Sequence, residues 1–386
     1  MLAILSVAGL AYALVVFVSA LRVIRGVPLV ASLEPKEPVA WPRVSVVVPA
    51  CNEADTLEAA MRSRLAEGYP NVEYLLVDDR STDGTGDIVD RLAAEDARIV
   101  ALHVEDLPAG WLGKVNAMQH GVEHANGDWI LFSDADIHHE PGMLARIVAH
   151  CEETGIDHVS VLPSIWSSTF WLDVMLSSVV RIMTSASRAW KIPDPTSRVS
   201  FGGGIFNLVR RSALERMGGL SPLKLEVIDD IGLGQLLKHS GARQAIFNAR
   251  GQVSLYWYRS VGEAVRGMEK NSFAALGRFN VVQFVVILGL FAVVELAPFV
   301  ALAAGAGPWR LLGGIASLLL LNAQWTSCRW LGRPVLATLL APIGSMLLLF
   351  GAARSMFVTL ARGGVEWRGT RYSLEALRAG MRFTLE

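Results

Sequence analysis

The segment Gly127-Asp128-Trp129-Ile130-Leu131-Phe132-Ser133-Asp134-Ala135-Asp136 decides how the rest of the chain is interpreted. Trp129 to Phe132 is a short apolar run, which is typical of a buried strand. Asp134 and Asp136 follow it directly. Carboxylates at i and i+2 at the end of a strand point to the same side, so they can share one hard cation and leave positions for water or phosphate oxygens. An isolated D-x-D is also an ordinary polar strand end, so its surroundings must decide.

The composition indicates a protein that is associated with a membrane. Of the 386 residues, 52% are hydrophobic and 18% are charged, and the mean hydropathy is +0.39, which is too apolar for an ordinary soluble enzyme. The net charge is −1 and the middle of the chain has no block of Lys and Arg, so we expect no nucleic acid partner. Cys51, Cys151 and Cys328 are too few and too scattered for a disulfide framework or a zinc site.

The N-terminal end has the features of a membrane anchor. Residues 1–25 include an apolar run about as long as the 20 residues that a helix needs to cross a bilayer. The run lacks a basic start and a cleavage site, so we expect it to be retained. Arg22 and Arg25 place its end in the cytoplasm by the positive-inside rule. The proline-containing residues 26–42 are interpreted as a linker.

Residues 43–280 have the pattern of an α/β domain. Apolar strands are expected at 44–48, 72–77, 99–103 and 129–132, with helices at 55–65, 86–94 and 113–124. This alternation predicts right-handed crossovers and a mostly parallel sheet. Ligands of such sheets bind outside the carboxyl ends of the strands. The polar residues that fall at these ends are Asn52, Asp78, Asp79, Asp134 and Asp136.

The C-terminal part is again apolar. An amphipathic helix at 260–279 is expected to lie at the membrane interface, and residues 281–360 contain three apolar stretches, interpreted as transmembrane helices. The arginines of residues 361–386 indicate a basic cytosolic tail. Three crossings from the cytoplasm would end outside, so we expect the last stretch, broken by Pro342 and Gly344, to be re-entrant.

Glu295 lies inside one of these apolar stretches. A carboxylate is costly in lipid, so such a residue is either functional or paired within the helix bundle. The sequence leaves both alternatives open.

The motifs of the middle region, in this order and spacing, resemble the family 2 glycosyltransferases, which are inverting enzymes with a GT-A fold. The resemblance covers about residues 43–280, and Val365 to Tyr372 also resembles the membrane members of that family. Residues 107–114 are most similar to the hopanoid-associated and carotenoid glycosyltransferases. The motifs are Val46-Val-Val-Pro-Ala-Cys-Asn-Glu53, Val77-Asp-Asp-Arg-Ser-Thr-Asp-Gly-Thr85, Gly113-Lys114, Asp134-Ala-Asp136, Gly202-Gly203 with Arg210-Arg211, and Ile228-Asp-Asp-Ile-Gly-Leu233.

The resemblance implies a role for each polar residue. A nucleotide-sugar donor has a diphosphate leaving group, whose growing charge a divalent metal neutralises. Asp136 is the implied ligand of Mg²⁺ or Mn²⁺, and Asp134 contacts the donor ribose or the metal shell. The remaining implied donor contacts are Asp79 with Asp78 behind it at the uracil edge, Asn52 and Glu53 in the nucleotide pocket, and Lys114 at the phosphates.

The acidic pair Asp229-Asp230 completes this implied site. Asp230 is the implied base that takes the proton of the acceptor hydroxyl. Asp229 is its neighbour, and two adjacent carboxylates should raise one pKa. Ordinary roles remain open: a turn for Asp78-Asp79, a solvated lysine for Lys114, and helix N-terminal acids for Asp229-Asp230.

The sequence also departs from the family pattern. Cys51 stands where many members have an aromatic residue, and Gln119 stands where Asn is usual. The Q-x-x-R-W motif is missing, and its nearest equivalent is Arg266-Gly-Met-Glu-Lys-Asn271. This absence argues against a processive polysaccharide synthase and leaves acceptor binding open.

These observations predict a multi-pass protein of the plasma (inner) membrane with its catalytic domain on the cytoplasmic side. We expect it to transfer one sugar from a nucleotide-sugar, a UDP-sugar first, to a lipid acceptor of the isoprenoid or hopanoid, sphingolipid or glycerolipid type. Alternatives are a polyprenyl-phosphate glycosyltransferase, a short polysaccharide synthase, and a membrane sensor that only binds nucleotide. A sensor should tolerate the loss of Asp230.

Overall fold

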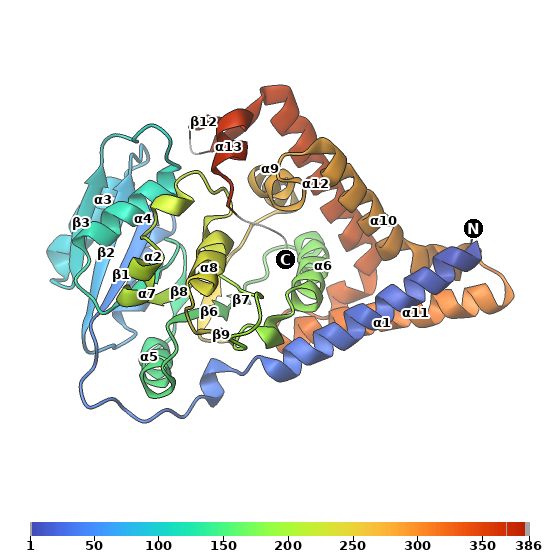
Figure 1. Ribbon diagram of the computed structural model, residues 1–386, viewed down its shortest axis with the longest axis horizontal. Coiled ribbons are helices and arrows are strands. Elements are labelled where there is room, and N and C mark those ends of the chain that lie inside the picture. Colours follow the sequence, from blue (N-terminus) through green and yellow to red (C-terminus); the bar gives the residue numbers. More distant parts are fainter. Residues whose placement is uncertain (1, 368, 383–386) are drawn as a thin grey trace.

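The computed structural model describes residues 2–367 and 369–382. An α/β domain lies on one side of the molecule and a group of long helices on the other (Figure 1). Residues 26–42 join the first long helix to this domain and run along the edge of its sheet, where the Asn248 N–H donates to Pro28 O at 2.8 Å.

A seven-stranded sheet forms the centre of the α/β domain, in the order β3-β2-β1-β4-β8-β6-β9. β8 is antiparallel to both of its neighbours and the other pairs are parallel, so the mostly parallel sheet is confirmed. The strands are β1 (Val44–Ala50), β2 (Val72–Asp79), β3 (Ile99–Val104), β4 (Trp129–Phe132), β6 (His158–Leu162), β8 (Asn207–Arg210) and β9 (Gln244–Asn248).

Helices cover both faces of this sheet, because its central strands are almost entirely apolar and buried on both sides. One apolar cluster joins the sheet to α2 (Leu57–Leu65), α3 (Thr85–Glu95) and α5 (Met143–Thr154). The opposite cluster joins it to α4 (Gly113–His124), α7 (Arg211–Arg216) and α8 (Asp229–His239). A small second sheet contains β5 (His138–His139), β10 (Val253–Leu255) and β7 (Ser164–Ile165).

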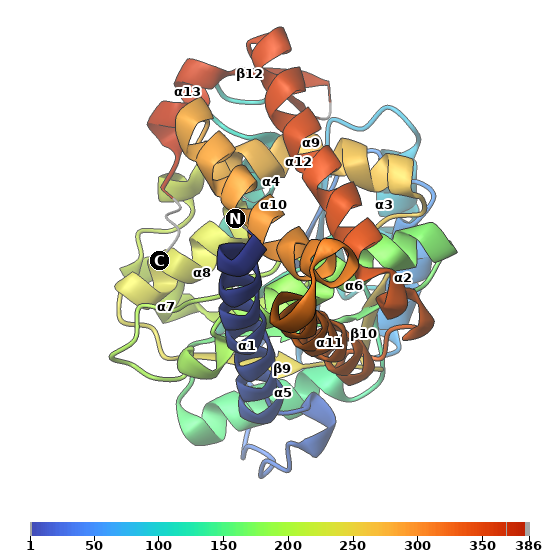
Figure 2. The same cartoon turned by 90° about the vertical axis from the view of Figure 1, so that its right-hand side faces the viewer.

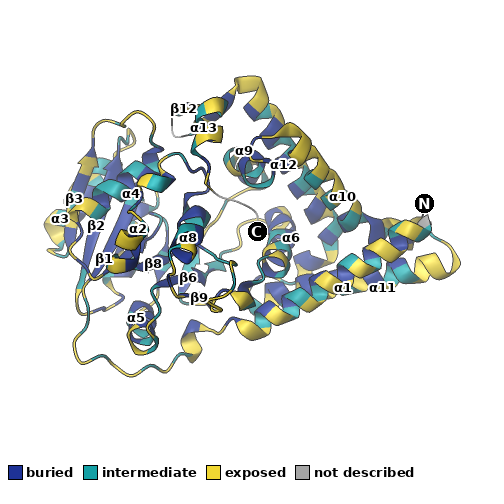
Figure 3. Cartoon of the chain, in the orientation of Figure 1, coloured by how far each residue is buried: buried dark blue, intermediate teal, exposed yellow. Residues whose placement is uncertain are grey.

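Among the residues that the structure describes, four helices are long and apolar enough to cross a membrane. They are α1 (Leu2–Gly26), α10 (Val281–Ala304), α11 (Gly307–Trp330) and α12 (Ala341–Arg362), the last preceded by the short helix η4 (Leu336–Leu340). α1 packs along α11, and α10 packs against α11 and α12 (Figures 1 and 2). Their outward faces expose many large apolar side chains (Figure 3), as lipid-facing surfaces do.

Two amphipathic helices, α6 (Phe170–Ala186) and α9 (Val261–Gly277), lie between the α/β domain and the long helices (Figure 1). α9 packs on α12, and α6 packs on α1, α11 and α12. The helix expected at 260–279 is therefore present. The structure places it against protein on one side, where Phe273 and Ala274 are fully buried.

The break in the last apolar stretch lies at Leu340, between η4 and α12, and not at Pro342 and Gly344 themselves. Pro342 lies in the first turn of α12, where the missing N–H has no helical acceptor to satisfy. Gly344 lies against α6, and a Cβ at this position would be 2.4 Å from Val174 O and Ser178 Oγ. The two residues therefore start the helix and let it approach α6.

The segment expected to be a basic tail folds back onto the α/β domain. It forms a hairpin of β11 (Gly364–Trp367) and β12 (Thr370–Ser373), followed by α13 (Leu374–Gly380). Tyr372 and Leu377 belong to the cluster that contains α4 and α8. Arg368 and residues 383–386 lie outside the described residues. β11, β12 and α13 are thus packed on the α/β domain, although they follow the long helices in the chain.

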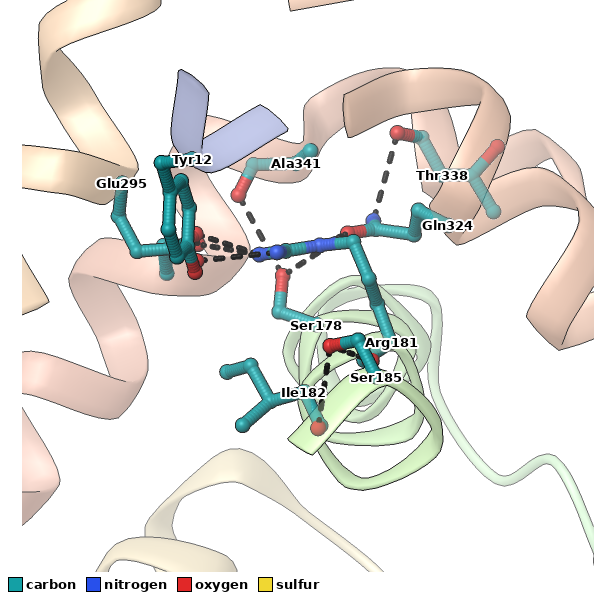
Figure 4. Close-up of polar contacts among 10 residues, drawn as sticks. Tyr12, Ser178, Arg181, Ile182, Ser185, Glu295, Gln324, Thr338 and Ala341 are labelled. Carbon is teal, nitrogen blue, oxygen red and sulfur yellow. Dashed lines mark hydrogen bonds and ion pairs between the residues drawn. The ribbon is translucent and has the colours of Figure 1, made fainter. Parts of the chain in front are cut away.

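Glu295 is paired within the helix bundle (Figure 4). Its carboxylate accepts hydrogen bonds from Arg181 of α6, from Tyr12 of α1 and, at 2.8 Å, from Ser345 of α12. Glu295 and Arg181 have side chains only 1% exposed. Gln324 of α11 also accepts from Arg181 Nε, at 3.1 Å. Four long helices and α6 thus share one buried polar network.

Candidate active site

A cavity of about 250 Å³ opens at the carboxyl ends of β1, β2 and β4. This is the edge at which the sequence predicts a site. Glu53, Asp79, Lys114, Asp134 and Asp136 all line it. The other lining residues are Pro49, Ala50, Cys51, Arg80, Gly113, Ala135, Trp257, Trp367 and Tyr372.

The loop after β4 presents Asp134 and Asp136 to the cavity. Arg64 of α2 lies fully buried beneath this loop and holds its backbone. It donates to Asp134 O and, at 3.0 Å, to Ile137 O. Burial lowers the pKa of Arg64 to about 10, so it remains a cation at neutral pH. The sequence alone does not indicate this role for Arg64.

The chemistry of this loop suits a divalent cation. Burial, followed by the charges of Asp134 and Glu53, raises the pKa of Asp136 to about 6. Hard oxygen ligands of this kind are those that Mg²⁺ and Mn²⁺ take. Within residues 2–367 and 369–382 no group of three or more acidic, His or Cys side chains forms a complete metal site. The carboxylates would therefore share a cation with oxygens of the substrate.

Lys114 connects this loop to the acidic pair at the start of α8. Its Nζ lies 2.7 Å from Asp134 Oδ1 and 3.5 Å from Asp229 Oδ2. Burial opposes its charge, but Asp134, Asp229 and Asp230 together raise the pKa of its ammonium. Lys114 is therefore a partly buried, permanently charged group between two sets of carboxylates, and it is not a solvated surface lysine.

Asp229 and Asp230 line a narrow recess that adjoins the cavity and shares Pro49, Lys114 and Asp134 with it. Asp230 accepts hydrogen bonds from the N–H groups of Gly204, at 2.9 Å, and Ile231, at 2.8 Å. Burial and then Asp229 raise the pKa of Asp230, against the effect of Lys114. The pKa of Asp230 is therefore raised, which is the direction expected for one member of a pair of adjacent carboxylates.

The segment Gly202 to Gly204 fits between the two sets of acids. The Asp134 N–H donates to Gly204 O at 2.9 Å, while the Gly204 N–H donates to Asp230. A Cβ on Gly202 would lie 1.9 Å from the backbone oxygen of Asp230. The backbones thus approach each other as closely as only glycine permits, and this sets the spacing between Asp134 and Asp230.

Replacing Gly202 by Ala should lower both thermal stability and turnover sharply, because the overlap is with backbone and α8 has to move. Overpacking of this kind typically costs about 1–3 kcal/mol. Gly203→Ala is the matched control, since its Cβ would meet only the Phe201 ring at 3.4 Å. Melting curves of the two variants in detergent check the prediction. Equal stability of both would contradict it.

Two predicted nucleotide residues do not line the cavity. Asn52 has a left-handed backbone (φ 56°), and its side-chain oxygen accepts from the Thr82 N–H at 2.8 Å. Asp78 accepts from the Ser81 N–H at 3.3 Å and contacts His103. Both residues hold the turn after β2. Asp79 does face the cavity, where it pairs with Arg80 at 2.8 Å.

The C-terminal hairpin forms one wall of the cavity, through Trp367 and Tyr372. The Tyr372 hydroxyl accepts a hydrogen bond from the Gly113 N–H at 3.2 Å, at the start of the helix that carries Lys114. Trp257 also lines the cavity. Sequence reasoning missed these aromatic residues as site residues, although the motif around Tyr372 was a signal.

Tyr372→Phe should weaken nucleotide binding about fivefold. The change leaves the buried Gly113 N–H without its acceptor, and one such hydrogen bond contributes about 1 kcal/mol. Tyr69→Phe is a suitable control, because the Tyr69 hydroxyl donates to Pro42 O at 2.8 Å and does not line the cavity. Nucleoside diphosphate titrations of both variants measure the effect. A Tyr69 variant that loses as much affinity would argue against a specific role for Tyr372.

Comparison with known proteins agrees with this geometry. Residues 45–218 match the model of the family described as Glycosyl transferase family 2. Glycosyltransferase GlyG of Streptococcus pneumoniae is 33% identical over 116 residues, which are 30% of this chain and 37% of that protein. The undecaprenyl-phosphate mannosyltransferase of Micrococcus luteus is 34% identical over 106 residues, 28% of this chain and 43% of that protein. The matched stretches span less than half of these relatives.

One solved structure is similar over most of the chain. Mannosyltransferase PcManGT from Pyrobaculum calidifontis, in complex with GDP-Man and Mn²⁺, has a TM-score of 0.58 and covers 90% of this chain and 99% of its own. Its sequence identity is 20%, so the similarity concerns the fold. Residues 45–218 are therefore similar to glycosyl transferase family 2, and the chain has the GT-A fold.

Proposed function

We propose that this chain is a membrane-bound inverting glycosyltransferase that moves a single sugar from a nucleotide-sugar to a lipid acceptor. The observation that supports this most is one cavity at the carboxyl ends of the strands. It brings the carboxylates of Asp134 and Asp136, the cation of Lys114 and, in the adjoining recess, Asp230 together.

The donor lies in the main cavity. Asp79 and Arg80 line the end where the base of the nucleotide binds, and Lys114 faces the diphosphate. A divalent cation held by Asp134 and Asp136 would neutralise the charge that grows on the leaving diphosphate. We propose a UDP-sugar as donor on the resemblance of Asp79 to the uracil-binding carboxylate.

Asp230 acts as the base from the adjoining recess. It takes the proton of the acceptor hydroxyl as that oxygen attacks the sugar from the side opposite the leaving group, which inverts the anomeric centre. Two N–H donors hold Asp230 in place. Burial and then Asp229 raise its pKa, while the charge of Lys114 opposes this effect. A base with a raised pKa is better matched to work near neutral pH.

The apolar helices support a lipid acceptor. α9 and α12 contact β11, which carries Trp367 of the cavity wall. A soluble acceptor would not need the four long apolar helices. We propose that the helices insert into the plasma (inner) membrane with the α/β domain in the cytoplasm. Both ends of α12 contact that side of the molecule: Arg333 before it donates to Ile165 O at 2.9 Å, and the hairpin after it lines the cavity. This supports a re-entrant α12.

An isoprenoid is the acceptor class that we propose first, on the resemblance of residues 107–114 to hopanoid-associated and carotenoid glycosyltransferases. A polyprenyl phosphate is the second candidate. It is favoured by relatives named as undecaprenyl-phosphate transferases, among them the mannosyltransferase of Micrococcus luteus and a 4-deoxy-4-formamido-L-arabinose transferase of Shewanella sediminis. The latter is 33% identical over 123 residues, 31% of this chain and 36% of that protein.

The proposed function is tested with the purified full chain in detergent, a panel of nucleotide-sugars and total membrane lipid, with Mn²⁺ or EDTA. A new glycolipid that forms only with metal and with one donor is the expected result. It would identify both substrates. Tight nucleotide binding without transfer to any lipid would instead favour a nucleotide sensor.

Asp136→Ala should abolish the dependence of nucleotide binding on metal. In the unsubstituted chain, we expect Mn²⁺ to increase affinity for a nucleoside diphosphate at least tenfold, because the cation bridges the carboxylates and the phosphates. Calorimetric titrations with Mn²⁺ and with EDTA measure this ratio. A variant with the same ratio as the original chain would remove Asp136 from the metal site.

A further inference from the structure

Lys270 of α9 lies against the C-terminal hairpin that forms one wall of the cavity. Its ammonium is 4.5 Å from the centre of the Trp367 ring, and Trp367 lines the cavity. The charged groups that act on Lys270 are Asp229, Asp230, Asp134 and Lys114, all of them residues of the site. Lys270 therefore belongs to the same electrostatic cluster as the proposed base.

The ammonium of Lys270 differs from that of Lys114 in its partners. Lys114 is in contact with two carboxylates, whereas Lys270 makes no salt bridge with any residue in the described ranges 2–367 and 369–382. A lysine on an aromatic face keeps its three N–H donors for another ligand. Burial lowers its pKa and the nearby carboxylates oppose that effect.

The turn of α9 that carries Lys270 is fixed by α12. The Ser355 hydroxyl donates to Glu269 O at 2.8 Å and accepts from the Phe273 N–H at 3.1 Å. These two backbone groups are four residues apart and would bond to each other in a regular helix. The Glu269 carboxylate also pairs with Arg354 and with Arg362. Hydrogen bonds between α9 and α12 thus fix the position of Lys270.

We propose that Lys270 binds a phosphate group on the membrane side of the active site, a contact that rests on the proposed function. A compact ammonium is a common phosphate ligand in proteins. The phosphate comes either from the diphosphate of the donor or from a phosphorylated lipid acceptor. Lys270 belongs to the stretch Arg266 to Asn271, which stands in place of the missing Q-x-x-R-W motif.

The proposal is tested by binding, so that it needs no turnover. The full chain in detergent is titrated with UDP and GDP in the presence of Mn²⁺, and separately with farnesyl phosphate and farnesol. Lys270→Met should weaken binding of a phosphate probe about tenfold or more, and Lys270→Arg should retain most of the affinity. Arg266→Met, one turn earlier on an exposed part of α9, is the matched control and should change affinity less than twofold.

The probe whose binding is weakened by Lys270→Met identifies the source of the phosphate. Loss of nucleotide affinity alone assigns Lys270 to the donor, and loss of farnesyl phosphate affinity alone assigns it to the acceptor. The proposal is overturned if Lys270→Met binds every phosphate probe as tightly as the original chain does. It is also overturned if the original chain binds none of these probes. If Lys270→Met does not fold, Lys270→Gln replaces it. The proposed function is tested by a different measurement, the transfer of sugar to lipid. Its failure can therefore be distinguished from failure of the Lys270 proposal.

Discussion

Asp230→Asn should reduce sugar transfer by a factor of about 10² to 10⁴, the range that a positioned general base contributes. Asparagine has nearly the same shape and keeps one side-chain oxygen, so it can accept one of the two hydrogen bonds from Gly204 and Ile231, but it cannot take a proton. Nucleotide affinity should stay within about twofold, because Asp230 lines the recess beside the main cavity. Turnover and nucleotide titrations of the same preparation check both expectations.

The pH profile provides an independent reading of the same residue. Burial and Asp229 raise the pKa of Asp230, and a base works only when it is deprotonated. Turnover should therefore fall as the pH decreases through a value above the ordinary aspartate pKa of about 4. This decrease of turnover at low pH should be absent from the residual activity of Asp230→Asn. Wild-type turnover in that variant would refute the base assignment. It would favour a phosphate acceptor, which is ionised before it attacks.

Glu295→Ala should destabilise the protein by about 3–5 kcal/mol, because it leaves the Arg181 cation buried without its partner. Arg181 is 1% exposed and would retain the weaker contacts to Gln324 and Ser345. At this exposure, bulk solvent does not take the place of the carboxylate. A thermal melt of the detergent-solubilised chain, followed by the retained monodisperse fraction, measures the loss.

The double variant Arg181→Met with Glu295→Gln is the informative control for this network. Removing both charges avoids a buried unpaired ion, so the double variant should be more stable than Glu295→Ala. If Glu295→Ala melts at the temperature of the original chain, the network has no structural role, and Glu295 returns to consideration as a functional group. The network joins α1, α6, α10, α11 and α12 (Figure 4), so its loss should also loosen α6.

Several features could be predicted from the sequence because they depend on local pattern. The strands at Val44 and Trp129 are continuous apolar runs that only a sheet buried on both faces accommodates. Parallel strands bring their carboxyl ends to one edge, so Asp79, Asp134 and Asp136 had to lie near each other. Helix α4 was also predicted with the bounds that it has.

Other features depend on contacts between residues far apart in the chain, which no local pattern contains. Arg64 supports the Asp134 loop from a helix 70 residues earlier, and Tyr372 reaches Gly113 across 259 residues. A proline such as Pro342 breaks a helix when it lies in the middle and is tolerated in the first turn. The local sequence does not show which of these positions it occupies.

The sequence by itself determined the α/β class, the edge of the sheet that carries the site and the apolar helices, because these follow from hydrophobic period and strand direction. Only the tertiary structure decided that the C-terminal hairpin forms a wall of the cavity, that Glu295 is neutralised by Arg181, and that Lys270 lies over the Trp367 ring. Each of these is a pairing between distant segments. The free energy of such a contact depends on both partners leaving water together. The residues next to either partner in the sequence therefore do not reveal the contact.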